Sequence, residues 1–282
     1  TGSYSWGACW PYEGQGFIGS FAETHEEGLP YPTKWVMVSD NLFGSSGAWP
    51  VSIGPQNGLL DERISDLIFE KNKIIVQYGI SSEVLPSLGV HLEGQYNTVR
   101  NNIIDGTGGA NGYIGIKVMH RATEDNTLPF IDECGSPRVM PAPPVGISVL
   151  NNTIYRSGLV PNGAEGVNVA ATATETVIRN NFISFPNENN DIAVNDLSNV
   201  SILSNNFMTN TPYFVDPDNV NPLARNFSLT PNSTEAINQG YTVPFLDDFS
   251  GNPRVAPYDI GAFEYSAGDM VAPDNPTGLS VL

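Results

Sequence analysis

His91, Glu93 and Lys117 carry side chains that can move a proton or bind an ion, and each alternates with apolar residues. Alternate side chains of a β-strand point to opposite faces, so these three polar groups are expected to face outward together. If their two runs lie on neighbouring strands, about 4.8 Å apart, the three groups line one solvent-accessible groove. A base beside a cation suits β-elimination from a uronate: the base removes the proton next to the carboxylate, and the cation neutralises that carboxylate.

The chemistry of these and nearby side chains suggests which of them takes each role in the elimination. Lys117 or His91 is the predicted base, and Arg121, Arg138 or a bound Ca²⁺ ion is the predicted neutralising cation. The plainer interpretation is that Lys117 and Glu93 form an ordinary ion pair on the surface.

Further residues are expected to complete this site. Asn168 follows Lys117 in the predicted outward column and is a candidate substrate-binding residue. Trp35 belongs to an aromatic cluster near the N-terminus, whose rings either stack on sugar rings or fill that end of the fold. The carboxylates that offer oxygen ligands to Ca²⁺ are Asp132 and Glu133, which we favour, with Glu93 and Asp125 beside them.

A second chemistry competes with elimination. If Glu62 and Glu93 lie on successive strands, their carboxylates are about 5 Å apart, near the separation found in retaining glycosidases. The same stacking of strands places Leu60 beside His91, at the head of an outward-facing column that continues through Lys117, Asn168 and Ala193. In a chain with 30 acidic residues, such a pair also arises by chance.

The elements that position these residues repeat along the chain. Six hexads have an apolar residue three before an asparagine and another two after it, and their asparagines lie 31, 30, 50, 29 and 25 residues apart. The asparagines are Asn41, Asn72, Asn102, Asn152, Asn181 and Asn206. A repeat of this length, rich in Val, Ile and Phe with Gly and Asn at the corners, predicts a solenoid of short strands.

Stacked coils would place these asparagines at one bend, where Asn tolerates left-handed backbone angles, in an amide ladder. Val99, Val149, Ile178 and Leu203 should then lie inside. We therefore predict an all-β fold, a right-handed parallel β-helix with long lateral loops.

A second strand is predicted upstream of each hexad, opened by Gly58, Gly89, Gly115, Gly166 or Asp191. The coil between Gly115 and Asn152 is too long, so residues from about His120 to Pro143 should leave the helix and lie over the strands of His91 and Lys117. A similar excursion is expected at Ala22–Lys34. Loops on one face of a repeat protein commonly mark its binding face.

After about Thr211 the repeat ends in a series of distinctive motifs. They are Phe214-Val-Asp-Pro217, Asn226-Phe-Ser-Leu-Thr-Pro-Asn-Ser233, Ala236-Ile-Asn-Gln-Gly240, Gly251-Asn-Pro-Arg254 and Tyr258-Asp-Ile-Gly-Ala-Phe-Glu-Tyr265. This succession resembles the C-terminal cap of secreted bacterial β-helix proteins of the pectate-lyase-like superfamily, over roughly residues 35–265. The resemblance implies an extracellular or cell-surface protein that acts on a polysaccharide. A cap is also expected physically, because the last coil otherwise leaves an unpaired strand edge.

Residues 1–265 are thus predicted to form one β-helix domain, with its cap at 211–265. Residues 266–282 combine a Gly/Pro/Asp-rich linker with Pro276-Thr-Gly-Leu-Ser-Val-Leu282, which is similar to the first strand of a fibronectin type III module. Further C-terminal modules are therefore expected in the native chain. Cys9 and Cys134 either form one bridge or remain free thiols.

The net charge of −18 excludes some partners. It repels nucleic acid and anionic membranes, and no apolar run is long enough to insert into a bilayer. It also disfavours a polyanionic substrate unless cations gather locally or a metal bridges the two. We predict a secreted polysaccharide lyase; a β-helical glycoside hydrolase and a non-catalytic adhesin or fibre of the cell surface are the alternatives.

Overall fold

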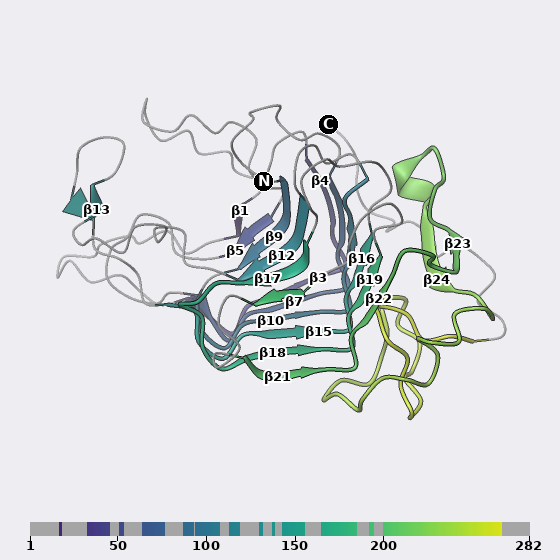
Figure 1. The fold of residues 1–282 in the computed structure, drawn as a ribbon. Helices are drawn as coiled ribbons and strands as arrows, with labels where there is room; N and C mark the ends of the chain where they lie inside the picture. The colour runs from purple at the N-terminus through teal and green to yellow at the C-terminus, as the bar shows by residue number, and fades with distance from the viewer. Residues whose placement is uncertain are drawn as a thin grey trace.

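The computed structural model describes residues 17–18, 33–45, 51–53, 64–76, 87–92, 94–107, 113–118, 130–131, 137–138, 143–155, 165–184, 192–194 and 200–266. Within these ranges the chain is built from short parallel strands stacked in three six-stranded sheets (Figure 1). Successive strands of the chain pass from one sheet to the next, so each circuit forms one coil. The predicted parallel β-helix is confirmed, while its handedness stays a prediction.

The three sheets share one stacking order along the solenoid. The first sheet contains β1 (Phe17–Ile18), β5 (Val51–Ile53), β9 (Ser87–Leu92), β12 (Tyr113–Val118), β17 (Glu165–Val169) and β20 (Ile192–Val194). The second contains β3 (Met37–Ser39), β7 (Ile68–Glu70), β10 (Thr98–Arg100), β15 (Ser148–Leu150), β18 (Thr176–Arg179) and β21 (Val200–Ser204). The third contains β4 (Leu42–Ser45), β8 (Lys73–Val76), β11 (Ile103–Asp105), β16 (Thr153–Tyr155), β19 (Phe182–Ser184) and β22 (Phe207–Thr209).

Shorter elements lie outside this stack. β2 (Thr33–Lys34) pairs in parallel with β6 (Ile64–Ser65). Two antiparallel pairs are formed by β13 (Phe130–Ile131) with β14 (Pro137–Arg138), and by β23 (Phe214–Asp216) with β24 (Asn226–Leu229). The 3₁₀ turn η2 (Pro222–Ala224) is capped by the side chain of Asn221. Among the described residues, no helix is long and apolar enough to cross a bilayer.

The predicted asparagine ladder runs through the bend between the second and third sheets. In each coil from Asn41 to Asn181, the backbone N–H and the side-chain Nδ2 both donate to Oδ1 of the next asparagine, at 2.9–3.2 Å. From Asn72 onward, Nδ2 also donates to a carbonyl of the preceding coil. The polar atoms of a buried bend are thereby satisfied, which makes Asn the residue the bend requires.

We expected the ladder asparagine to adopt the left-handed backbone angles of this bend. In the structure the residue before it does so instead. Those residues have φ between 50° and 58°: Asp40, Lys71, Asn101, Asn151, Asn180 and Asn205. The ladder asparagine must point inward to reach its neighbours, so the change of direction falls on the preceding residue. Asn, Asp and Lys supply it, and Asn and Asp adopt this region more readily than most residues.

The interior is a stack of apolar residues contributed by all three sheets. Val99, Val149 and Ile178 are completely buried, as predicted. Leu203 is in register with Ile178 in the neighbouring strand, yet 43% of it is exposed. The expectation that Leu203 lies inside is therefore wrong, because among the described residues no strand stacks beyond β21.

The reason is the path of the C-terminal segment, residues 211–266. It packs along the side of the solenoid, over the outer face of the third sheet and the asparagine bend, and not over its end (Figure 1). Phe214 and Phe227 cover Ile103, Tyr155 and Phe182 of the third sheet. The predicted terminal cap is thus a lateral strap.

Among the described residues, the long insertion between β12 and β15 forms only the β13–β14 hairpin. Its two strands pair with each other and with none of the three large sheets, so the insertion leaves the coil as predicted. Its position over the strands of His91 and Lys117 stays a prediction. The excursion at 22–34, Cys9, Cys134 and residues 267–282 lie mainly or wholly outside the described ranges.

Candidate functional site

The outer face of the first sheet carries the column that the sequence predicted. Lys117 is in register with His91 on one side and with Asn168 on the other, and Asn168 is in register with Ala193. The residues between them, such as Val90 and Ile116, are fully buried in the core. Alternation along the strands therefore places His91, Lys117 and Asn168 together; we call these three residues the outer column.

Its first member differs from the prediction. Ser52 of β5, and not Leu60, pairs with His91. We expected the run after Gly58 here, because its leucines follow a glycine as in the other coils; instead β5, the segment Val51–Ile53, pairs with β9. Glu62 and Glu93 lie outside the described residues, so the glycosidase pair stays a prediction.

The members of the outer column differ in exposure. His91 is only 1% exposed, so its predicted solvent accessibility is wrong. Its strand has a neighbour on each side, and the side chains of adjacent coils flank each other closely in such a stack. Lys117 and Asn168 are half-buried, and Asn168 donates to Oε2 of Glu165 at 2.6 Å. Lys117 is thus the better candidate for contact with a ligand.

Other predicted site residues lie where the structure does not describe them. Glu93, Arg121, Asp132 and Glu133 are outside the described ranges. Arg138 belongs to β14, but its side chain is also outside the description. In the described ranges, no group of three His, Cys, Asp or Glu side chains is arranged to hold a metal ion.

Trp35 lies at the corner between the first and second sheets, and it is 83% exposed. This exposure favours the surface role over the filling of the N-terminal end. In its corner column, one residue per coil adopts a positive φ, from 54° to 67°: Trp35, Asp66, Tyr96, Gly146 and Glu175. Backbone hydrogen bonds of 2.7–3.3 Å connect successive coils at this corner.

Tyr96 is a second exposed aromatic residue in that column, with 54% of its surface accessible. A Cβ built on Gly146 would lie 2.4 Å from Cδ1 of Tyr96, so the ring rests on the glycine of the next coil. Trp35 and Tyr96 are two coils apart, or about 9.6 Å. We call this pair the aromatic corner. Sequence reasoning missed Tyr96, although both aromatic residues precede the first apolar residue of their hexads by three positions.

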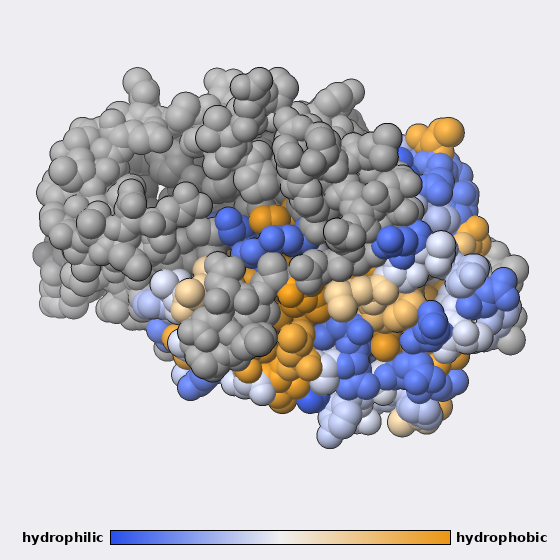
Figure 2. Space-filling view, in the orientation of Figure 1, coloured by the Kyte–Doolittle hydropathy of each residue, from blue (hydrophilic) through white to orange (hydrophobic). Residues whose placement is uncertain are grey.

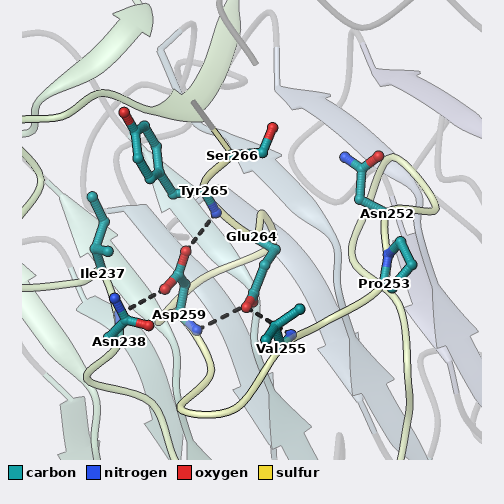
Figure 3. Close-up of a pocket in the computed structure, with 9 residues that line it drawn as sticks. All are labelled: Ile237, Asn238, Asn252, Pro253, Val255, Asp259, Glu264, Tyr265 and Ser266. Carbon is teal, nitrogen blue, oxygen red and sulfur yellow. Dashed lines mark hydrogen bonds between the residues drawn. The ribbon is translucent and has the colours of Figure 1, made fainter. Parts of the chain in front are cut away.

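A separate hollow of about 200 Å³ lies within the C-terminal segment (Figure 3). Asp259 and Glu264 are its acidic lining residues, and burial raises the pKa of both carboxyl groups. The oxygens of Asp259 accept the backbone N–H of Asn238 and Tyr265. Glu264 accepts those of Val255 and Asp259.

Buried Arg254 completes this cluster. It donates to Oε2 of Glu264 at 3.1 Å and to Oδ1 of Asn101 at 2.8 Å, and burial lowers the pKa of its guanidinium. Backbone donors and one arginine thus satisfy the carboxylates, which fix turns of the strap. Their arrangement is structural and gives no acid–base pair.

Lys73 has the perturbed pKa expected of a base, since burial lowers it to about 8. Its Nζ, however, donates to the carbonyls of Leu223 and Arg225 under the C-terminal segment. The lysine is enclosed there, so it holds the strap to the third sheet and is no candidate base.

Comparisons with known proteins leave the chain without an assigned family: no family model, curated protein or solved structure matches it. The candidate site accordingly rests on its own geometry, the outer column beside the aromatic corner.

Proposed function

We propose that this chain is an extracellular polysaccharide-active β-helix protein of the pectate-lyase-like type, which binds a glycan along the aromatic corner and the outer column. The observation that carries the proposal is the pair of exposed rings two coils apart. Sugar rings present apolar faces that stack on aromatic rings, and Trp35 and Tyr96 offer two exposed rings in one corner column.

The reaction we propose is β-elimination from an acidic polysaccharide. Lys117 takes the proton next to the uronate carboxylate, the electron pair left behind forms a carbon–carbon double bond, and the glycosidic oxygen leaves and gains a proton. Lys117 is in register with His91, and the strand of His91 ends at Leu92, four residues before Tyr96, so the proposed base lies near the aromatic corner. Buried His91, adjacent in register, is a positioning residue for Lys117.

The negative charge of the developing intermediate needs a cation. Arg121, Arg138 or a Ca²⁺ ion bound by Asp132 and Glu133 remains our prediction for this role. Such a cation would also reduce the repulsion between an acidic glycan and a protein of net charge −18.

The test is a panel of purified acidic polysaccharides, with ultraviolet absorbance of the unsaturated product as the readout. Lys117→Ala should lower the rate about 10²- to 10⁴-fold, with little change in melting temperature. Lys71→Ala is the matched control, because Lys71 pairs with Asp247 at the asparagine bend. Equal activity in both variants would exclude Lys117 as the base.

Binding measured separately distinguishes the non-catalytic alternative. If the wild-type protein releases no product but retains a glycan through Trp35 and Tyr96, the chain is an adhesin. If replacement of both rings by alanine leaves retention and turnover unchanged, the aromatic corner is no sugar platform.

A further inference from the structure

The two ends of the asparagine ladder are complementary to each other. Every ladder asparagine before the last donates its backbone N–H to Oδ1 of the next. At the last coil, among the described residues, no acceptor meets the N–H of Asn206. At the first coil, Oδ1 of Asn41 meets no donor in the same ranges. One end therefore offers a donor and the other an acceptor.

Among the strands that the structure describes, those at the two ends of the stack are edges of their sheets. β21 and β22 terminate the second and third sheets at one end, and β3 and β4 terminate them at the other. These four strands contain no charged residue and no proline, in a chain with 42 charged residues. Natural edge strands usually carry such residues to prevent pairing with another chain. Their absence at both ends leaves the edges competent to pair.

Apolar side chains are exposed at both edges as well. At the last coil, Leu203 and Met208 are 43% and 44% exposed. At the first coil their counterparts in the register, Val38 and Phe43, are only partly buried. Figure 2 shows apolar side chains reaching the surface at the bottom of the view, where Figure 1 places β21. Asn41 is exposed too, whereas the four internal ladder asparagines are completely buried.

We propose that the solenoid associates head to tail with a second copy of itself, β3 and β4 of one copy stacking on β21 and β22 of the next. The contact repeats the one that joins each coil to its neighbour, with the N–H of Asn206 donating to Oδ1 of Asn41 in the other copy. In that register Leu203 and Met208 meet Val38 and Phe43 across the junction. This inference does not depend on the proposed enzymatic activity.

Such a contact joins different surfaces and does not close on itself, so it produces open chains of copies. The net charge of −18 on each copy opposes association, and salt screens this repulsion. We therefore expect the average mass to rise with protein concentration and with NaCl up to about 1 M, where the Debye length is about 3 Å.

The decisive experiment blocks one end at a time in the full chain. Leu203→Lys blocks the last coil, and Asn41→Lys blocks the first, because exposed Asn41 supplies the acceptor at that end. Each substitution places a charge in the junction and should weaken association at least about tenfold. Each variant alone should be monomeric in sedimentation velocity. A mixture of the two should form a 1:1 dimer, because each retains the end that the other lacks.

Val220→Lys is the matched control, since this residue is 96% exposed and lies in the C-terminal segment, outside the three large sheets. It should associate like the wild type, and all three variants should keep the wild-type melting temperature. The proposal is overturned if the wild type stays monomeric at high salt, if either blocked variant still dimerises alone, or if the mixture stays monomeric. Dimers of Asn41→Lys alone would indicate tail-to-tail pairing instead.

Discussion

At the scale of single residues, paired asparagines hold two parts of the molecule together. The second asparagine of each doublet enters the ladder, and the first points outward to the C-terminal segment. Nδ2 of Asn101 donates to the carbonyl of Asp247, and that of Asn180 donates to the carbonyl of Tyr241. Asn205 reaches the carbonyl of Gln239 in the same way. Each doublet therefore contributes one asparagine to the ladder and one to the attachment of the strap.

The hexads predicted the ladder but not this second role. Four of the six hexads contain an Asn-Asn doublet, but from the sequence we assigned a role only to the second asparagine. In the first two coils the same position holds Asp40 and Lys71. Lys71 replaces the amide contact by an ion pair with Asp247, so the docking role is kept by different chemistry.

Buried charge in the strap predicts an unusual dependence of stability on pH. Burial raises the pKa of Glu264 above its usual 4.5, so the folded protein keeps a proton that the unfolded chain releases in that interval. The stability contribution therefore falls as pH rises through the window between 4.5 and the raised value. In Glu264→Gln the share of this dependence that Glu264 contributes should be lost, while the share of buried Asp259 remains. Acidification from pH 7 to the window should therefore stabilise the wild type relative to the variant.

Urea titrations at a series of pH values measure this difference. Exposed Glu235, replaced by glutamine, removes the same charge without the burial and serves as the control. Acidification also weakens the repulsion among the many carboxylates, and this changes the stability of the wild type and of both variants alike. Parallel pH profiles for wild type and Glu264→Gln would contradict the assigned cause.

At the scale of elements, glycines set how closely the first and third sheets approach. A Cβ on Gly115 would lie 2.4 Å from Cγ2 of Ile154, and one on Gly166 would lie 2.5 Å from Cγ2 of Ile183. Both isoleucines are fully buried core residues of the third sheet. The glycines that the sequence offered as strand openers are thus close-contact positions inside the coil.

Gly115→Ala should therefore destabilise the fold by about 1–3 kcal/mol, because the core must shift to accept one methyl group. Gly44→Ala is the matched control: it also lies in a strand, and a Cβ there meets nothing within 4 Å. Its effect should stay within about 0.5 kcal/mol. Chemical denaturation of both variants measures the contrast, and equal effects would show that the close approach costs nothing.

The sequence predicted coils far better than it predicted loops. The hexads gave the register of two sheets, since a one-residue slip would turn every buried side chain outward. In the first sheet the prediction from the sequence failed at Gly58: it assigned a strand to the run that contains two leucines, whereas the short strand β5 takes that place in the sheet. The burial of His91 and the lateral path of the C-terminal segment depend on contacts between distant parts of the chain. No local pattern encodes these contacts.

At the scale of the whole molecule, the lateral strap changes how a solenoid should unfold. Repeats that contact only their neighbours can unfold from an end, coil by coil. Here the strap contacts coils from Lys71 to Asn205, and Arg225 pairs with buried Asp105 at 2.6 Å in between. Sliding or fraying of one coil would break contacts with the strap, which couples the coils to one another.

We therefore expect this part of the chain to unfold as one unit. Phe227→Ala tests it, because this fully buried strap residue packs against Tyr155 with ring centroids 5.2 Å apart. The substitution should cost about 3–5 kcal/mol. In hydrogen exchange, the amides of Ile104 and Ile183 inside the coils should lose protection by the same amount as those of the strap. Leu246→Ala, at an exposed strap position, should leave both unchanged. A strap that opens alone while the amides of Ile104 and Ile183 stay protected would mean that it covers the solenoid without coupling its coils.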